Sequence, residues 1–280
     1  MAKPPSKKRE IVAAKVMTGL AQGYLEYEID VERILKVELP KAFDAIPVAG
    51  LTQAAIAELP AGAKGAYLLF QDGVPVYAGK TDTRHGFRQR LGRHLETIQD
   101  RTGIDPTRVG FKAARIMVFS NFDVEAILIK EMRARGTGAL PWNFSGFGSN
   151  DPGHRREGQK PAKFDLLFPV DLDRALGFLS PGDISVLEIV NLLKGKLPYY
   201  FRFETDPLPS GQSSAPTVGH ADFRAVPKIS VPSSPLTVRE TLKLILKVLP
   251  AGWYANVFPN RVILYKDPTT YRFTREVISA

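Results

Sequence analysis

The chain has 280 residues, of which 44% are hydrophobic and 24% are charged, a balance typical of a globular protein that buries a core. Lys and Arg outnumber Asp and Glu by 38 to 29, and the resulting net charge of +9 favours polyanionic partners such as nucleic acid. The absence of cysteine excludes a disulfide, a thiolate nucleophile and a cysteine-ligated zinc site, and it fits a cytoplasmic location.

The amino-terminal region predicts neither export nor membrane insertion. The first ten residues are basic, no apolar stretch of a secretory signal comes after them, and nowhere do about 18 apolar residues run consecutively. Apolar residues recur at helical spacing in residues 9–23 and 31–37, and Pro40, Pro47 and Pro60 interrupt the next stretch of chain. We therefore interpret residues 1–58 as a basic tail and a helical preface, and we expect no membrane association.

Residues 59–165 predict a β-β-α-β-α domain. Residues 66–70 and 74–78 have strand character and are joined by Asp72-Gly73, a strong hairpin turn, while Pro75 indicates either a position that faces no partner strand or a locally irregular ladder. An arginine-rich helix is expected at 87–99, a third strand at 111–119 and a second helix at 125–135, which Asn121 or Asp123 would cap. The Gly-, Asn- and Pro-rich residues 142–156 predict a long functional loop. The expected fold class is α+β, a small antiparallel sheet flanked by helices.

The last third predicts a small αβ extension with a weak internal repeat. After strand-like residues 164–170, Ser185 and Thr237 each open a helix with a capping box, completed by Glu188 and Glu240, and each helix leads into an aromatic strand. Residues 206–235, rich in Pro, Ser and Gly, predict a flexible linker. The sequence thus divides this region into a helix-strand extension (166–205), the linker (206–235) and a C-terminal helix plus hairpin (236–280).

A series of polar residues occurs along the predicted elements in order. Gly65-Ala66-Tyr67 and Tyr77-Ala78-Gly79 lie on the two hairpin strands, and the later positions are Arg90, His94, Glu125 and Asn143. This pattern resembles the GIY-YIG nuclease superfamily over residues 59–156, although alanine replaces both middle isoleucines, which concerns strand packing. Within it, residues 141–153 (PWNFSGFGSNDPG) and 159–165 (QKPAKFD) are similar to the GIY-YIG type II restriction endonucleases.

Phosphodiester hydrolysis gives each of these side chains a role. It needs an activated water, positive charge on the phosphate oxygens and a cation near the leaving group. The resemblance implies Tyr67 as the general base and Tyr77 as the group that orients water or phosphate, while the residues alone leave the choice of tyrosine open. A phenol has an ordinary pKa of about 10, so we expect a cation, Lys80, to lower it.

The remaining members supply charge and positioning. Arg90 and His94 lie one helical turn apart and would face phosphate and water. Glu125 would bind Mg²⁺, for which Mn²⁺ is an acceptable substitute, and Asn143 would hold the loop or the scissile phosphate. Beyond the seven catalytic candidates, we expect DNA contacts from two further groups: Arg84, Arg88, Arg93, Lys112 and Arg115 for the phosphates, and Asn150, His154, Arg155 and Arg156 in the loop.

Three functions remain open. The first is a type II restriction endonuclease that cuts double-stranded DNA as a homodimer, because palindromic sites require two active sites. The second is a repair or mobile-element nuclease, and the third is a non-catalytic DNA-binding protein on a nuclease scaffold. A nucleotide cofactor is not expected, because Val74 occupies a position where a P-loop needs glycine.

Overall fold

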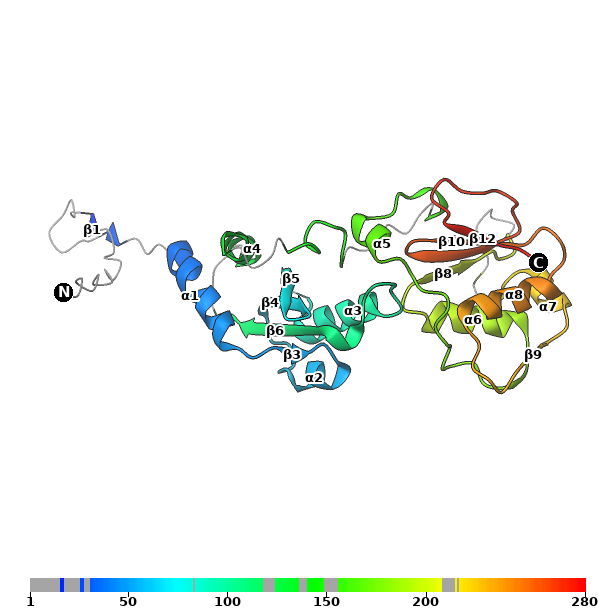
Figure 1. Ribbon diagram of the computed structural model, residues 1–280, viewed down its shortest axis with the longest axis horizontal. Helices are drawn as coiled ribbons and strands as arrows, with labels where there is room; N and C mark the ends of the chain where they lie inside the picture. The colour runs from blue at the N-terminus through cyan, green and yellow to red at the C-terminus, as the bar shows by residue number, and fades with distance from the viewer. Residues whose placement is uncertain are drawn as a thin grey trace, which may run out of the picture.

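The computed structural model describes residues 16–17, 26–27, 31–82, 84–117, 124–135, 140–148, 156–207, 215 and 217–280. From residue 31 onward the chain forms two units that lie side by side along the long axis of the molecule (Figure 1). We call residues 31–168 the amino unit and residues 170–278 the carboxyl unit. Among the helices of the described residues, none is both long and apolar enough to cross a bilayer.

The amino unit is built on a four-stranded sheet. Its order is β3-β6-β4-β5 and every neighbouring pair is antiparallel. The strands are β3 (Ala49–Gly50), β4 (Gly65–Gln71), β5 (Val74–Lys80) and β6 (Val109–Arg115). Asp72 and Gly73 both have positive φ, 53° and 78°, as a tight hairpin turn requires. The ladder shifts between Leu69 and Phe70, opposite Pro75, so the predicted irregularity is confirmed.

Helices cover both faces of this sheet. Alternation along β4 places Tyr67 and Leu69 on one face, in a core shared with α2 (Gln53–Glu58) and α3 (Phe87–Ile98). Ala66, Leu68 and Phe70 point to the other face, in a core shared with α1 (Val31–Ala45) and α4 (Val124–Ala134). Since β3 and α1 belong to this body, the predicted preface is part of the sheet-and-helix unit.

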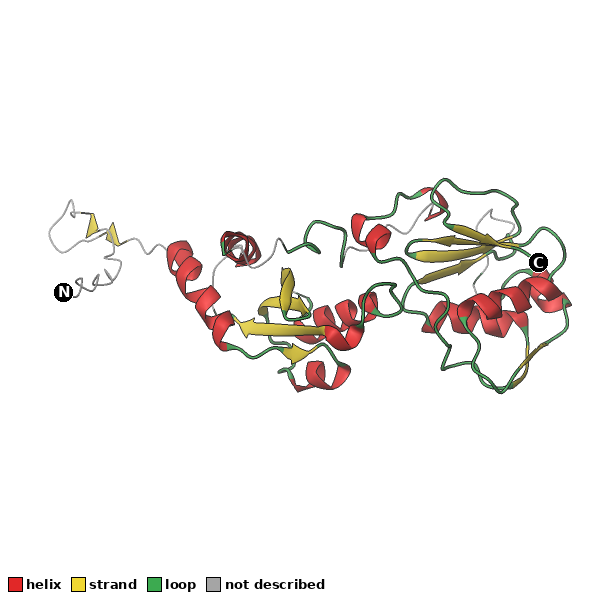
Figure 2. Cartoon of the chain, in the orientation of Figure 1, coloured by secondary structure: helices red, strands yellow, loops and turns green. Residues whose placement is uncertain are grey.

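The carboxyl unit has a mixed sheet of order β12-β10-β11-β8, in which only β11 and β8 are parallel among the described strands. Two helices lie together on one side of it (Figure 2) and share its core. The sheet and its helices are β8 (Tyr200–Phe203), β10 (Tyr254–Phe258), β11 (Arg261–Tyr265), β12 (Glu276–Ile278), α6 (Val186–Lys196) and α8 (Val238–Val248). Residues 166–205 and 236–280, which the sequence analysis treats as separate segments, thus share one hydrophobic core.

The α+β class is confirmed, and so are both capping boxes: Ser185 with Glu188 opens α6, and Thr237 with Glu240 opens α8. The linker prediction is wrong for part of residues 206–235. α7 (Ala221–Ala225) buries Phe223, and β9 (Ile229–Val231) pairs with β7 (Gly182–Ile184). Apolar residues spaced among the prolines provide enough burial to order this stretch.

Three further elements differ from the sequence predictions. Residues 164–170 do not begin with a strand: α5 (Lys163–Leu167) is a short helix whose Phe164 packs on Trp142. α1 continues through Pro40, because burial of its neighbours Leu39 and Phe43 offsets the lost backbone hydrogen bond.

In the predicted helical stretch 9–23, the described residues form β1 (Val16–Met17), which pairs with β2 (Glu26–Tyr27). The structure does not describe Asn121 and Asp123, the predicted caps of α4.

Candidate active site

Two tyrosines meet on one face of the hairpin. Tyr67 lies directly opposite Gly79 in the β4–β5 ladder, and Tyr77 is the next residue of β5 on that face. Their ring centroids are 6.1 Å apart. A β-carbon at Gly79 would come within 2.6 Å of the Tyr67 hydroxyl and 2.7 Å of the Tyr77 ring. The glycine is therefore what allows both rings to occupy this face.

Helix α3 packs on the same face of the sheet as the two tyrosines and carries Arg90 and His94. The Nε2 atom of His94 is 2.8 Å from the Tyr67 hydroxyl, and its ring is 5.1 Å from the Tyr77 ring. The charge of Arg90 acts on both phenols and favours their ionised form, and its buried Nε has no hydrogen-bond partner among the described residues. The Tyr67 hydroxyl and the His94 imidazole share one hydrogen bond, whose direction depends on the tautomer of the imidazole. Arg90, Tyr67, Tyr77 and His94 thus form one cluster.

Burial determines the charge states. It raises the pKa of Tyr67 and of Tyr77 above the ordinary tyrosine value, and Arg90 opposes the rise at both. Burial, aided by the positive charges of Arg90 and Arg93, lowers the pKa of His94 from 6.5 to about 3. At neutral pH both phenols are thus protonated and His94 is neutral. The Nδ1 atom of His94 is buried and has no hydrogen-bond partner within the described part of the chain.

Glu125 belongs to the same cluster. It lies in the first turn of α4, is half-buried, and its charge raises the pKa of both Tyr67 and Tyr77. The described residues contain no group of three or more His, Asp or Glu that could hold a metal ion. A single carboxylate still suits Mg²⁺, which keeps several waters and is commonly bound through one or two carboxylates plus substrate phosphate. Glu125 could therefore serve as the protein ligand of a magnesium ion whose other sites water and phosphate oxygens would fill.

Asn143 attaches the loop to the edge of the sheet. Its Oδ1 accepts from the Ala78 amide and its Nδ2 donates to the Ala78 carbonyl, both at 2.8 Å. Next to it, the Trp142 amide donates to the Val76 carbonyl at 3.0 Å. The Asn143 side-chain amide thus completes the edge of β5 at Ala78, the residue between Tyr77 and Gly79. Of the two roles predicted for Asn143, the structure shows the one of holding the loop.

Lys80 is not the cation next to the tyrosines. In the ladder it pairs with Ala66, on the face opposite to Tyr67 and Tyr77 and towards α4, and its side chain is exposed. The prediction that Lys80 lowers the pKa of these phenols is therefore wrong, and Arg90 takes that place. Alternation counted from Tyr77 already assigns Lys80 to the other face.

The predicted DNA contacts separate by position. Arg84 and Arg115 are exposed, Arg93 lies on α3 next to His94, and Arg88 is exposed with its Nε donating to the Leu59 carbonyl. Lys112 differs from the expectation: it lies on the α1 side of the sheet, where its ammonium donates to the Phe43 carbonyl and lies over the Phe70 ring. The structure does not describe Asn150, His154, Arg155 and the side chain of Arg156.

The sequence did not single out two neighbours of the site. Phe147 stacks on His94 with ring centroids 4.8 Å apart, and a β-carbon at Gly148, which has a positive φ of 70°, would lie 2.8 Å from that imidazole. Their signal was the Gly-Phe-Gly run at 146–148, which combines an aromatic ring with two glycines in a loop. These residues close the site over His94.

Comparison of the chain with models of protein families finds none that matches, and comparison with curated proteins finds no match either. The case for a function therefore rests on the geometry of the site together with the motifs of the sequence.

Proposed function

We propose that this protein is a metal-dependent endodeoxyribonuclease of the GIY-YIG kind, and specifically a type II restriction endonuclease. The observation that carries the proposal is the convergence of Tyr67, Tyr77, Arg90 and His94 on one face of the hairpin, with Glu125 close enough for its charge to act on both phenols. Separately, each residue has an ordinary structural role. Together they supply the proton acceptor, the positive charge and the metal carboxylate that phosphodiester hydrolysis requires.

The chain's own groups divide the work. Arg90 would neutralise the non-bridging phosphate oxygens, since its positive charge acts on both phenols. His94, which burial keeps neutral, lies with its Nε2 2.8 Å from the Tyr67 hydroxyl and fixes the position of that hydroxyl, while the charge of Arg90 favours its ionised form. Glu125 would hold Mg²⁺ or Mn²⁺, which supplies positive charge at the leaving oxygen and activates water. We propose Tyr67 as the base, because it has the histidine contact.

Cleavage of plasmid DNA with Mg²⁺ or Mn²⁺, with and without EDTA, tests the proposal. Glu125→Gln should abolish cleavage and leave DNA binding intact, because it removes the metal carboxylate without changing size. Glu131→Gln, on the same helix and with the same charge change, is the matched control and should cut as the wild type does. Discrete fragments support restriction, and smearing or a preference for branched DNA supports the repair alternative. Binding without cleavage under either metal would establish the non-catalytic alternative and refute the enzyme.

The restriction function also requires two active sites on a palindromic duplex. We therefore propose a homodimer on DNA. Light scattering of the protein with and without a cleavable duplex in Ca²⁺ tests this, and a single subunit per duplex that still cuts both strands together would contradict it.

A further inference from the structure

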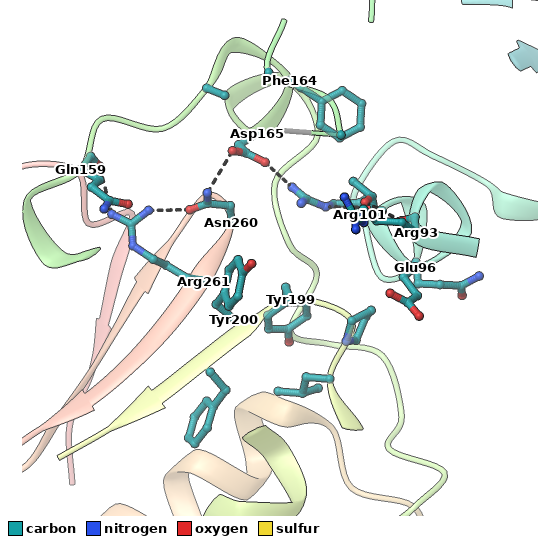
Figure 3. A pocket seen from close by; sticks show the side chains of 18 of the residues that line it. Arg93, Glu96, Arg101, Gln159, Phe164, Asp165, Tyr199, Tyr200, Asn260 and Arg261 are labelled. Carbon is teal, nitrogen blue, oxygen red and sulfur yellow. Dashed lines mark hydrogen bonds and ion pairs between the residues drawn. The ribbon is translucent and has the colours of Figure 1, made fainter. Parts of the chain in front are cut away.

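A cleft of about 990 Å³ separates the two units next to the active site. Its amino-unit side is formed by α3, the loop after α4 and α5, and its carboxyl-unit side by the end of α6, the start of β8 and the β10–β11 turn (Figure 3). Six basic residues line it, Arg93, Arg101, Lys160, Lys194, Lys196 and Arg261, against two acidic ones, Glu96 and Asp165. The cleft therefore has a strongly positive lining.

One wall of the cleft is a continuous chain of hydrogen bonds between the two units (Figure 3). Arg101, only 7% exposed, donates to Asp165 at 2.9 Å, and Asn260 donates to the other oxygen of that carboxylate at 3.0 Å. Arg261 continues the chain, donating to Asn260 at 2.6 Å and to the Gln159 carbonyl at 3.0 Å. These groups hold the two units together, so the cleft is formed before any ligand binds.

The basic groups that face solvent lie elsewhere in the cleft. Lys160, Lys194 and Lys196 are exposed, and Arg93 is half-buried. Lys194 and Lys196 come from the last turn of α6, where positive charge also suits the helix dipole. A test must therefore separate a ligand-binding role from a role in the helix itself.

The cleft lies beside the proposed active site, although Tyr67, Tyr77, Arg90, His94 and Glu125 do not themselves line it. Arg93 lines the cleft, and its neighbour His94 lies in the site. Gly148 touches His94 and lines the cleft as well. Deeper in the cleft, the Tyr199 hydroxyl is buried and has no hydrogen-bond partner among the described residues, and Tyr200 beside it is 47% exposed. A polyanion bound in the cleft would thus meet basic, hydroxyl and aromatic groups and pass the Arg93 and Gly148 side that adjoins the site.

We propose that this cleft binds the sugar-phosphate backbone of the DNA strand that flanks the scissile bond, with Lys160, Lys194 and Lys196 as phosphate contacts. The inference rests on the proposed function and assigns the carboxyl unit a role in it. At about 990 Å³ the cleft lies at the upper limit of small-molecule sites, and its exposed lysines suit a polyanion rather than an enclosed ligand. The clamp of hydrogen bonds sets the distance between these lysines and the catalytic residues.

The test compares two pairs of lysines on equivalent helices. Lys194→Gln/Lys196→Gln removes two charges from the cleft. Lys243→Gln/Lys247→Gln removes two exposed charges from α8, outside the cleft, and includes a last-turn lysine as well. The probe is a mixed-sequence DNA duplex several turns long, and its Kd for the full-length protein in Ca²⁺ is measured at several salt concentrations.

Removal of one phosphate contact should lower the slope of log K against log salt by about 0.9, so the slope of the cleft variant should fall by about 1.8 and its binding should weaken roughly tenfold at low salt. The α8 variant should keep the wild-type slope. For Lys160→Gln, on a different segment, the slope should fall by about 0.9 even if α6 is sensitive to substitution.

Unchanged slopes in both cleft variants would overturn the cleft inference while wild-type cleavage with Mg²⁺ left the proposed function standing. Conversely, if the variants change the slope as predicted but the wild type never cleaves DNA, the proposed nuclease function is refuted and the DNA-binding role of the cleft stands. A wild type that does not bind DNA refutes both.

Discussion

Protonation of the buried His94 should make the stability of the amino unit depend on pH. Its pKa is lowered from 6.5 to about 3 by burial and by the charges of Arg90 and Arg93. Below pH 6.5, His94 therefore binds a proton in the unfolded chain but stays neutral in the folded protein. The stabilisation is complete above pH 6.5 and is lost progressively as pH falls towards 3. At pH 5 the unfolded state should gain about 2 kcal/mol from this one histidine, and about 4 kcal/mol by pH 3.

Urea denaturation at pH 8 and pH 5 measures the effect. The protein has one tryptophan in each unit, Trp142 and Trp253, so a Trp253→Phe background restricts the fluorescence to the amino unit. In that background the parent protein should lose about 2 kcal/mol more between the two pH values than its His94→Gln variant, which cannot titrate. His85→Gln, which removes an exposed histidine paired with Asp82, should keep the full loss. Equal losses in the parent protein and His94→Gln would show that His94 is not held neutral by burial.

Three other substitutions probe the site and the clamp. Gly79→Ala should slow plasmid cleavage about 100-fold by displacing the tyrosine rings, whereas Gly92→Ala, in open space on α3, should raise stability by about 1 kcal/mol and leave the rate unchanged. Asn143→Ala should lower the free energy of unfolding by about 2–4 kcal/mol, because it leaves both polar groups of Ala78 without their partner; a cost below about 0.5 kcal/mol in urea denaturation would contradict this. Arg101→Met should cost about 3–5 kcal/mol, because the largely buried Asp165 carboxylate loses its cation, and a thermal melt as stable as the wild type would show that the clamp is dispensable.

Local sequence patterns were sufficient for the catalytic hairpin and its helix. Asp72-Gly73 determines the turn, alternation sets the two faces, and the spacing of Arg90 and His94 puts them on one side of α3. These features depend on residues near one another in the chain. For that reason the order β4-β5-α3-β6-α4 could be predicted from the sequence.

Contacts between distant segments were not predictable in the same way. Asn143 completes the edge of β5 across 65 positions in sequence, and Arg101 meets Asp165 across 64. Likewise, residues 164–170 alone favour a strand, but the contacts of Phe164 and Phe168 with Trp142 stabilise the helix α5 instead. Propensity is weak compared with such tertiary packing, which is where the sequence predictions were wrong.

The attachment of Asn143 to β5 has a consequence for how the protein can be observed. Among the described strands none pairs with the outer edge of β5, so the Ala78 amide is protected from solvent hydrogen exchange while the side-chain Oδ1 of Asn143 accepts from it. Its exchange rate therefore reports the opening equilibrium of residues 141–148, one residue away from Tyr77. A single backbone amide thus provides an intrinsic probe of whether this loop is closed over the reactive residues, in the absence of DNA, metal or any added label.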